Sequence, residues 1–507
     1  MSSIDSVFVV LTAIVKTTNS PALRNSRFSP IDEFGNSKLV FLGSEKGFDT
    51  HFGHMGFHSI DWKGEAADMS SEKELVKQRW DIRDATASKD IGIVGTIPFP
   101  GLALVGLLPE NGFVSSDTMV MSTMWGSSVQ IVRVNVHSGK VRLIRTQDQA
   151  SQSEPYELTS QDLLCVTPTG DIIVKETSPN KPGAVGYITN EQLLKDDVAE
   201  VGASVTPVAS FSPLASSSCS SVPSSVRWLS DYSYQILTLE RPSGNNKWSA
   251  PIQCILMLPS KQRAKGKPPP MIVLPHGGPH SVSTPSFVSE LGGFLCGHAG
   301  YALLLVNYRG SIGFGQAAVE DLPSRIGDLD VLDVVHAVKH VAKTGLVDPE
   351  RLAICGGSHG GFLTGHCIGQ FPDLFKAACM RNPVTNIATM TSTTDIPDWA
   401  VIEACGLGKY DWKHFTGPSA EQLTVMYNKS PIAHSHKVKT PTLMALGTKD
   451  LRVPPSQGLE YYHVLRSKGV ETKLLLYDDC DHPIGAVCSK ADHWINIKRW
   501  FDKHVPP

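Results

Sequence analysis

Hydrophobic and polar positions follow two different patterns along this chain, and the change falls near residue 204. Before that point, short apolar and β-branched runs are separated by turn residues such as Gly, Asn and Ser. Short strands at regular spacing are typical of a β-sandwich, barrel or propeller. A weak recurrence of strand, turn and strand over about 40–50 residues favours propeller blades. The clearest runs are 38–43, 119–122, 129–134 and 171–175.

Residues 204–231 differ in composition from the segments on either side. They are rich in Ser, Pro and Val, and small residues fill positions 216–221. A segment with so few large apolar side chains cannot bury enough surface to order itself. The composition therefore predicts a linker over 204–231, and it leaves 1–203 as the β-rich portion.

From residue 232 to 507, apolar strands alternate with helical patterns. The runs 271–274 and 301–306 are continuously apolar, as expected for parallel strands covered by helices on both faces. Between residues 331 and 341, five valines recur at helical spacing, which predicts one buried helix face. The alternation predicts a doubly wound α/β domain.

A nucleophile elbow is predicted within this α/β portion. The sequence Gly-Gly-Ser-His-Gly at 356–360 follows the apolar run 352–355 and precedes a helix-compatible segment. In this strand–turn–helix arrangement the turn is tight and strained, and it holds the serine hydroxyl above the sheet. The adjacent glycines avoid side-chain collisions. Ser358 is therefore the candidate nucleophile.

The candidate acid and base follow the serine in the chain. A serine hydroxyl needs a neighbouring imidazole, and the imidazole needs an orienting carboxylate. In α/β-hydrolases the acid precedes the histidine, and each lies just after a later strand. Asp450 follows the apolar run 443–446, and His482 follows the run 473–477. Both order and position match, so the sequence predicts Ser358, Asp450 and His482 as the catalytic residues.

Other acids and histidines fit these roles less well. The segment around residues 395–403 is irregular, which favours solvated charges, and the two alternative histidines lie in helical patterns near the C-terminus. The acidic residues close to His482 are interpreted as a solvated loop and not as groups that raise the pKa of the histidine. These competitors are Asp395, Asp398, Glu403, His463, His493, Asp478, Asp479 and Asp481.

An oxyanion hole requires N–H donors aimed at the reacting oxygen. The backbone N–H of His359, directly after the serine, is one candidate. The other lies in the loop after the run 271–274, where His276, Gly277 and Gly278 form the H-G-G pattern that takes this role. The amides of His276 and His359 are expected to matter more than their side chains.

A metal site at His51, His54 and His58 is the weaker alternative, because no helix or strand pattern fixes their spacing. The sequence also contains no phosphate-binding loop of the Walker type and no dinucleotide-binding fingerprint. No metal and no cofactor is therefore expected.

Composition narrows the class further. A length of 507 residues favours about two to four domains. The net charge of −3 gives no electrostatic reason to expect nucleic acid or anionic membrane as a partner. Ten cysteines occur without a C-x-x-C pair, which predicts reduced thiols in a cytoplasmic protein. The apolar run 7–15 is too short to span a membrane and predicts a buried strand.

Several motifs resemble the prolyl oligopeptidase family of serine peptidases, and within it the acylaminoacyl-peptidases of animals. The likeness covers roughly residues 232–507 and is looser before them. The stretches that resemble the family as a whole are 307–315, 356–361 and 450–454; those that resemble the acylaminoacyl-peptidases are 275–280, 381–384 and 394–399.

This resemblance implies a β-propeller joined to an α/β-hydrolase domain. It also implies a cytoplasmic exopeptidase that releases an N-acyl, often N-acetyl, amino acid from short blocked peptides. In that reaction Ser358 would be the nucleophile that forms an acyl-enzyme, His482 the general base and then acid, and Asp450 the orienting carboxylate. The animal members imply a homo-tetramer, without metal or cofactor.

The β-rich portion is shorter than the resemblance implies. Seven or eight blades need on the order of 300–400 residues, whereas about 200 precede the linker, enough for about four. We therefore expect an N-terminally shortened propeller, whose open sheet edges favour pairing with another chain. Two alternatives stay open: a general oligopeptidase or esterase of the same family, and an inactive shortened isoform that acts as a subunit partner.

Overall fold

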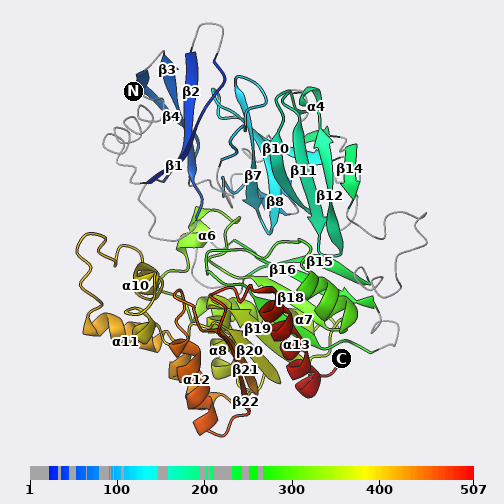
Figure 1. The fold of residues 1–507 in the computed structure, drawn as a ribbon, viewed down its shortest axis with the longest axis vertical. Helices are drawn as coiled ribbons and strands as arrows, with labels where there is room; N and C mark the ends of the chain where they lie inside the picture. Colours follow the sequence, from blue (N-terminus) through cyan, green and yellow to red (C-terminus); the bar gives the residue numbers. More distant parts are fainter. Residues whose placement is uncertain are drawn as a thin grey trace. The chain divides into compact units, whose positions relative to one another are not determined.

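In a computed structural model the chain divides into two compact units (Figure 1). The first comprises Met1–Cys219 with two short segments, Thr284–Phe287 and Ile312–Ala317, and the second comprises the rest of the chain. The structure describes residues 22–31, 36–44, 53–63, 66–78, 91, 93–94, 96–103, 108–146, 158–194, 200–203, 206–210, 231–241, 250–260 and 267–507. The run 7–15, predicted as a strand, lies outside these ranges.

The first unit is built from β-sheets (Figure 1). Its described residues form three four-stranded sheets, β1-β2-β3-β4, β13-β9-β8-β7 and β10-β11-β12-β14, and one two-stranded ribbon, β5-β6. The bounds are β1 (Ala22–Phe28), β2 (Asn36–Ser44), β3 (Gly56–Lys63), β4 (Ala66–Val76), β5 (Ile93–Val94), β6 (Ile97–Pro98), β7 (Thr118–Trp125), β8 (Ser128–Asn135), β9 (Val141–Thr146), β10 (Ser160–Val166), β11 (Ile172–Ser178), β12 (Lys181–Ile188), helix α4 (Asn190–Leu194), β13 (Glu200–Ala203) and β14 (Thr206–Ser210).

These sheets have the form of propeller blades, and neighbouring sheets pack through apolar side chains. The predicted strands at 38–43, 119–122, 129–134 and 171–175 are found in β2, β7, β8 and β11. Apolar residues of β7 and β8 share a buried cluster with those of β11, among them Val120, Ile131 and Ile172. A sheet that is apolar on one face must bury it against another element, and the next sheet provides the surface.

The predicted linker over 204–231 needs a correction at its start. Residues 206–210 form β14, which pairs antiparallel with β12. Composition did not reveal this strand because its stability comes from backbone hydrogen bonds to a partner that is distant in sequence. Pro207 is compatible with β14 because the strand lies at the edge of its sheet. Residues 211–230 lie outside the described ranges.

The second unit contains one eight-stranded sheet, in the order β15-β16-β18-β17-β19-β20-β21-β22. The pairs β15–β16 and β16–β18 are antiparallel, and all later pairs are parallel. This is the strand order of the α/β-hydrolase fold. The bounds are β15 (Tyr232–Leu239), β16 (Ile252–Pro259), β17 (Met271–Pro275), β18 (Ala302–Asn307), β19 (Leu352–Gly357), β20 (Ala377–Arg381), β21 (Thr442–Gly447) and β22 (Thr472–Tyr477).

Helices cover both faces of this sheet, as the alternation of the sequence predicts. One buried cluster contains residues of α7, α8 and α12, and the cluster on the other face contains residues of η2 and α13. The valines of 331–341 are all buried in α7, so the predicted helix face is confirmed. The helices are η2 (Ser289–His298), α6 (Gln316–Glu320), α7 (Leu329–Ala342), α8 (His359–Gln370), α9 (Ile387–Met390), α10 (Pro397–Cys405), α11 (Ala420–Asn428), η3 (Pro431–Lys437), α12 (Ser456–Ser467) and α13 (Val487–His504).

Two further observations concern the described ranges as a whole. None of their helices is both long and apolar enough to cross a membrane. Their nine cysteines are all free thiols, and six of them are buried.

Candidate active site

Ser358 lies at the predicted elbow, between β19 and α8. Its φ is +58°, a left-handed backbone conformation that residues other than glycine rarely adopt. Its N–H donates to the carbonyl of Arg381 at 3.0 Å. A side chain at Gly356 would collide with the backbone of Gly360, and one at Gly360 would collide with the carbonyl of Pro275. Both glycines of the motif are therefore required by the close approach of the strand, the turn and the neighbouring loop.

Asp450 and His482 are brought together from the ends of β21 and β22. Nδ1 of His482 lies 2.7 Å from Oδ2 of Asp450, so Nδ1–H donates to the carboxylate. Oδ1 of Asp450 accepts from the backbone N–H groups of Arg452 and Val453, each at 2.9 Å. These bonds fix the buried carboxylate. Because Nδ1 of His482 carries the ring proton, Nε2 is left as the proton acceptor. This is the tautomer that a general base needs.

Ser358 and His482 line the same pocket. Its volume is about 200 Å³, and its lining residues are Gly357, Ser358, Arg381, His482, Pro483 and Ile484. The His482 side chain is 28% exposed, whereas that of Asp450 is fully buried. The arrangement presents a hydroxyl and an unprotonated imidazole nitrogen to a substrate while the carboxylate stays away from water.

The H-G-G loop passes directly beside the nucleophile. A Cβ atom built on Gly277 would lie 3.3 Å from Cβ of Ser358 and 3.9 Å from its Oγ. The backbone N–H of His359 begins α8, where unpaired N–H groups and the positive end of the helix dipole favour negative charge. Both backbone segments that were predicted to form an oxyanion hole therefore border Ser358.

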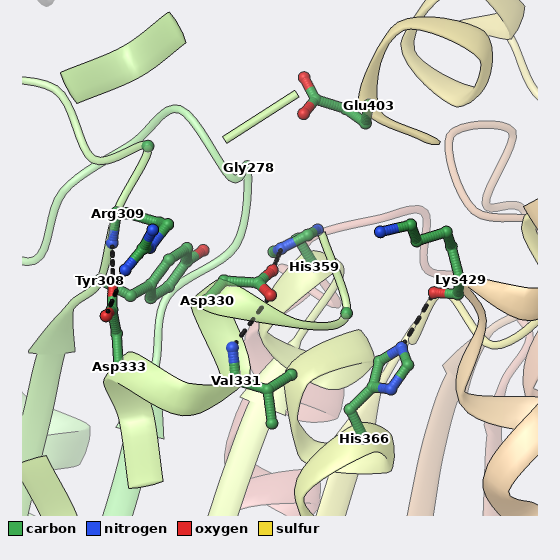
Figure 2. Close-up of polar contacts among 12 residues, drawn as sticks. Gly278, Tyr308, Arg309, Asp330, Val331, Asp333, His359, His366, Glu403 and Lys429 are labelled. Atoms are coloured by element: carbon green, nitrogen blue, oxygen red, sulfur yellow. Dashed lines mark hydrogen bonds and ion pairs between the residues drawn. The ribbon is translucent and has the colours of Figure 1, made fainter. Parts of the chain in front are cut away.

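The side chain of His359 has a separate, structural environment. It is fully buried, and its Nε2 lies 3.0 Å from Oδ2 of Asp330 at the start of α7 (Figure 2). The ring stacks on Phe362 at a centroid distance of 4.7 Å. This anchoring holds the imidazole of His359 in the core, and the oxyanion role of its amide stays a prediction.

The His276 imidazole is also held by structural hydrogen bonds. Its Nδ1 lies 2.7 Å from the carbonyl oxygen of Gly277, which can only accept, so Nδ1 carries a proton. Nε2 lies 2.8 Å from Oγ of Ser311. Tyr308 donates its hydroxyl hydrogen to the carbonyl of His276 at 2.8 Å. Burial lowers the pKa of His276 to about 4, so the ring is neutral near pH 7.

Sequence reasoning missed the residues that hold the far end of this loop. Glu403 of α10 was interpreted as a solvated charge, and that interpretation is wrong: its carboxylate is buried 3.0 Å from Nε2 of His280. One helical turn earlier, the indole N–H of Trp399 donates to the carbonyl of Gly278 at 3.0 Å. Figure 2 shows Glu403 above the loop that carries Gly278. The i, i+4 spacing of Trp399 and Glu403 places both on one face of the helix. This spacing was the sequence signal that could have shown that the two residues act together.

The pair of His280 and Glu403 carries charge. Nδ1 of His280 lies 2.8 Å from the carbonyl of Gly310, so both ring nitrogens face acceptors and both donate. Burial acts to lower the pKa of His280, but the carboxylate and the hydrogen bonds outweigh burial and raise it. Breaking such a buried pair from one side costs about 3–5 kcal/mol.

A second buried ion pair fixes the loop after β18. The guanidinium of Arg309 donates from Nε and Nη2 to the carboxylate of Asp333, at 3.0 Å each, and the backbone N–H of Arg309 donates to the same carboxylate (Figure 2). Arg241 also contacts this carboxylate, at 2.7 Å. Tyr308 precedes Arg309 directly, so the pair positions the hydroxyl that holds the H-G-G loop.

Asn382 connects the acid loop to the base loop. It lies in the stretch 381–384 that resembles the acylaminoacyl-peptidases, but no local pattern predicted this role. Its amide donates to the carbonyl of His482 at 2.9 Å and to that of Asp481 at 3.3 Å. Its amide oxygen accepts from the N–H of Gly447, at the start of the loop that carries Asp450, at 2.8 Å. The residue is buried, with φ +39°. One side chain therefore sets the separation of the two loops that present the acid and the base.

We expect Asn382→Gly to lower kcat by about 10–100-fold with little change in KM, because a misplacement of about 1 Å in the base costs roughly that much. Glycine removes the amide while accepting the positive φ. Steady-state kinetics on an acetyl-alanyl anilide would measure the effect. Asn496→Ala, on the surface of α13, is the control and should keep wild-type kcat. A variant with lower thermal stability but wild-type kcat would show that Asn382 supports only the fold.

Three further competitors occupy other environments. Asp395 forms a half-exposed ion pair with Arg452 at 2.7 Å. His463 is an exposed residue of α12. His493 is buried in α13, and burial lowers its pKa to about 4. None of these three residues lines the pocket that contains Ser358 and His482.

The histidines considered for a metal site do not converge in the part of the chain that is described. His51 lies outside the described ranges. Burial lowers the pKa of His54 to about 4, and its Nε2 accepts N–H groups from Gly313 and Gly315 at 3.3 and 3.1 Å within the first unit. His58 stacks on Phe41 and faces Glu72. Across the described ranges, no three His, Cys, Asp or Glu residues could hold a metal ion together.

Known proteins are similar to both halves of the chain. The model of the prolyl oligopeptidase family matches residues 288–506, and that of the acylamino-acid-releasing enzyme N-terminal domain matches residues 3–192. The acylamino-acid-releasing enzyme of Arabidopsis thaliana is 36% identical over 485 residues, which are 94% of this chain and 58% of the plant protein. The mouse acylamino-acid-releasing enzyme is 44% identical over 256 residues, which are 50% of this chain and 34% of the mouse protein. The chain thus spans less than two thirds of the length of these relatives.

Solved structures agree on the fold. An acylaminoacyl peptidase of Pyrococcus horikoshii superposes with a TM-score of 0.65 at 18% identity, over 92% of this chain and 62% of that one. A puromycin hydrolase superposes with a TM-score of 0.64 at 17% identity, over 96% of this chain and 70% of the hydrolase. The fold is therefore part of a β-propeller followed by an α/β-hydrolase domain. Since family models match both halves and a 36% identical relative aligns along 94% of it, the chain belongs to the prolyl oligopeptidase family of serine peptidases.

Proposed function

We propose that this protein is a serine exopeptidase that hydrolyses the first peptide bond of N-blocked peptides and releases an N-acyl amino acid. The observation that carries the proposal is the pocket that the strained Ser358 and His482 both line, with the imidazole of His482 held at 2.7 Å by Asp450. The acyl specificity rests on the relatives, which are named acylamino-acid-releasing enzymes. The catalytic domain in this proposal is residues 232–507.

The geometry of the site supports the following reaction. Nε2 of His482 takes the proton of Ser358 as its Oγ attacks the carbonyl carbon of the scissile bond. The negative charge on the carbonyl oxygen is stabilised by the backbone N–H of His359 and by the H-G-G loop. His482 then gives the proton to the leaving amine, so that an acyl-enzyme forms on Ser358. Water, deprotonated by His482, attacks the ester and releases the acyl amino acid.

Asp450 holds the imidazole throughout this cycle. Its carboxylate accepts from Nδ1–H and stabilises the imidazolium that forms in each proton transfer. The buried pairs Arg309–Asp333 and His280–Glu403 hold the oxyanion side, and Asn382 holds the base side. No step requires a metal or a cofactor. A homo-oligomeric assembly and a cytoplasmic location, both implied by the family resemblance, belong to the same proposal.

A comparison of blocked and free substrates tests the proposal. We expect the purified chain to hydrolyse acetyl-alanyl p-nitroanilide but not alanyl p-nitroanilide, whose amine is free. Similar rates on both substrates would favour a general oligopeptidase or esterase. Absence of turnover by folded protein would contradict the proposed activity and favour the inactive subunit partner.

A further inference from the structure

The proposed mechanism leaves one charged side chain in the pocket without a role. Arg381 ends β20 and lines the pocket together with Ser358 and His482. Its guanidinium carbon lies 4.9 Å from the ring centroid of Trp494, and its Nε is buried without a hydrogen-bond partner. Within the described part of the chain, no carboxylate forms an ion pair with it. A half-buried cation that is not neutralised by the protein can be neutralised by a bound anion.

Two other arginines of the second unit differ from Arg381 in this respect. Arg309 faces Asp333 at 3.0 Å, and Arg452 faces Asp395 at 2.7 Å. Each of those guanidinium groups therefore already has a carboxylate. A planar guanidinium fork matches a carboxylate in a two-bond geometry, and such charge-assisted bonds are stronger than neutral ones.

The position of the pocket indicates which part of a substrate would reach Arg381. His482, Pro483 and Ile484 line it, and no residue of the H-G-G loop 276–280 does. In acyl transfer the histidine delivers its proton to the leaving amine, so the leaving group lies on the His482 side of Ser358. The acyl portion and its oxyanion lie on the side of the H-G-G loop.

The size of the pocket limits the leaving group. A volume of about 200 Å³ is smaller than the ~300–1,000 Å³ of pockets for drug-sized ligands. It suits one or two small residues and not a long chain. A leaving group that short ends in an α-carboxylate close to its reacting amine.

We propose that Arg381 binds the terminal α-carboxylate of a short leaving peptide, so that the pocket selects blocked peptides with a free C-terminus close to the scissile bond. This inference rests on the proposed function, since it assigns the leaving-group side of the same site. Trp494 holds the guanidinium from one face, and the carboxylate pairs with its charge from the side of the pocket.

The test compares acetyl-Ala-Ala, which has a free carboxylate, with acetyl-Ala-Ala-amide. We expect wild-type kcat/KM to be about tenfold higher for the acid, as one charge-assisted hydrogen-bonded contact predicts. Arg381→Gln should bring the ratio of the two kcat/KM values close to one. Arg381→Lys, which keeps the charge but not the fork, should keep part of the preference. Lys439→Gln, a surface charge removal beside Asp373, is the control and should keep the wild-type ratio.

The outcomes separate this inference from the proposed function. Equal kcat/KM for acid and amide in the wild type would overturn the inference alone, even if Arg381→Gln failed to fold. A preference that survives in folded Arg381→Gln would also overturn it. Loss of turnover on both wild-type substrates would overturn the proposed function and the inference with it.

Discussion

Ser358→Ala is expected to abolish hydrolysis of an acetyl-alanyl anilide, with a fall in kcat of about six orders of magnitude. The hydroxyl is the only group at the elbow that can form the acyl-enzyme, and its removal leaves the oxyanion donors and the binding pocket in place. Labelling by an organophosphonate should be lost at the same time, because the reagent attaches to the serine oxygen. Alanine keeps the Cβ atom at φ +58°, so the fold should be unchanged.

Two measurements make this result interpretable. Circular dichroism and thermal unfolding should match between Ser358→Ala and the wild type. Ser467→Ala, which removes an exposed hydroxyl at the end of α12, should keep both turnover and labelling. Wild-type labelling of Ser358→Ala would show that the nucleophile lies elsewhere.

Asp450→Asn is expected to lower kcat by about 10⁴-fold. The asparagine amide can donate to Nδ1 of His482, which moves the imidazole proton to Nε2 and removes the acceptor that Ser358 needs. The backbone N–H groups of Arg452 and Val453 can still bind the remaining oxygen, so the loop keeps its shape. Steady-state kinetics on the acetyl-alanyl anilide would measure the loss.

Asp398→Asn is the matched control for this acid. Asp398 lies in α10 and is one of the acids that fit this role less well in the sequence. We expect its substitution to leave kcat within about twofold of wild type, because Asp398 does not line the pocket of Ser358 and His482. Near-wild-type activity in Asp450→Asn together with inactivity in Asp398→Asn would reverse the assignment of the acid.

The sequence predicted the elements of the second unit well because their signals are local. The apolar runs predicted as strands are found in β17, β18, β19, β21 and β22, and the valine face is buried in α7. Each of these signals lies within about fifteen consecutive residues, where periodicity reports burial directly. The predicted start of the linker was wrong for the opposite reason, since β14 is stabilised by its pairing with β12 and not by a local pattern.

The candidate acid and base were also accessible from the chain alone. Asp450 and His482 each follow a predicted strand in the order that the hydrolase topology requires, and the fold places them 2.7 Å apart. Their catalytic roles stay predictions until the substitutions above are measured. Glu403 was misjudged because nothing in its local pattern shows that His280, 123 residues earlier, faces it in the core.

The order of strands and helices in the second unit, the elbow with its serine and glycines, and the candidate acid and base could all be predicted from the chain alone. Backbone geometry and hydrophobic periodicity act over a few neighbouring residues, and so they can be read along the chain. The groups that hold that site in place became visible only in the folded structure. Asn382 bonds to residues 65 and 100 positions away, and Arg381 lies beside His482 without a carboxylate partner in the described residues. Such contacts depend on how distant segments meet at the ends of the strands, because burial and charge pairing are properties of the assembled core.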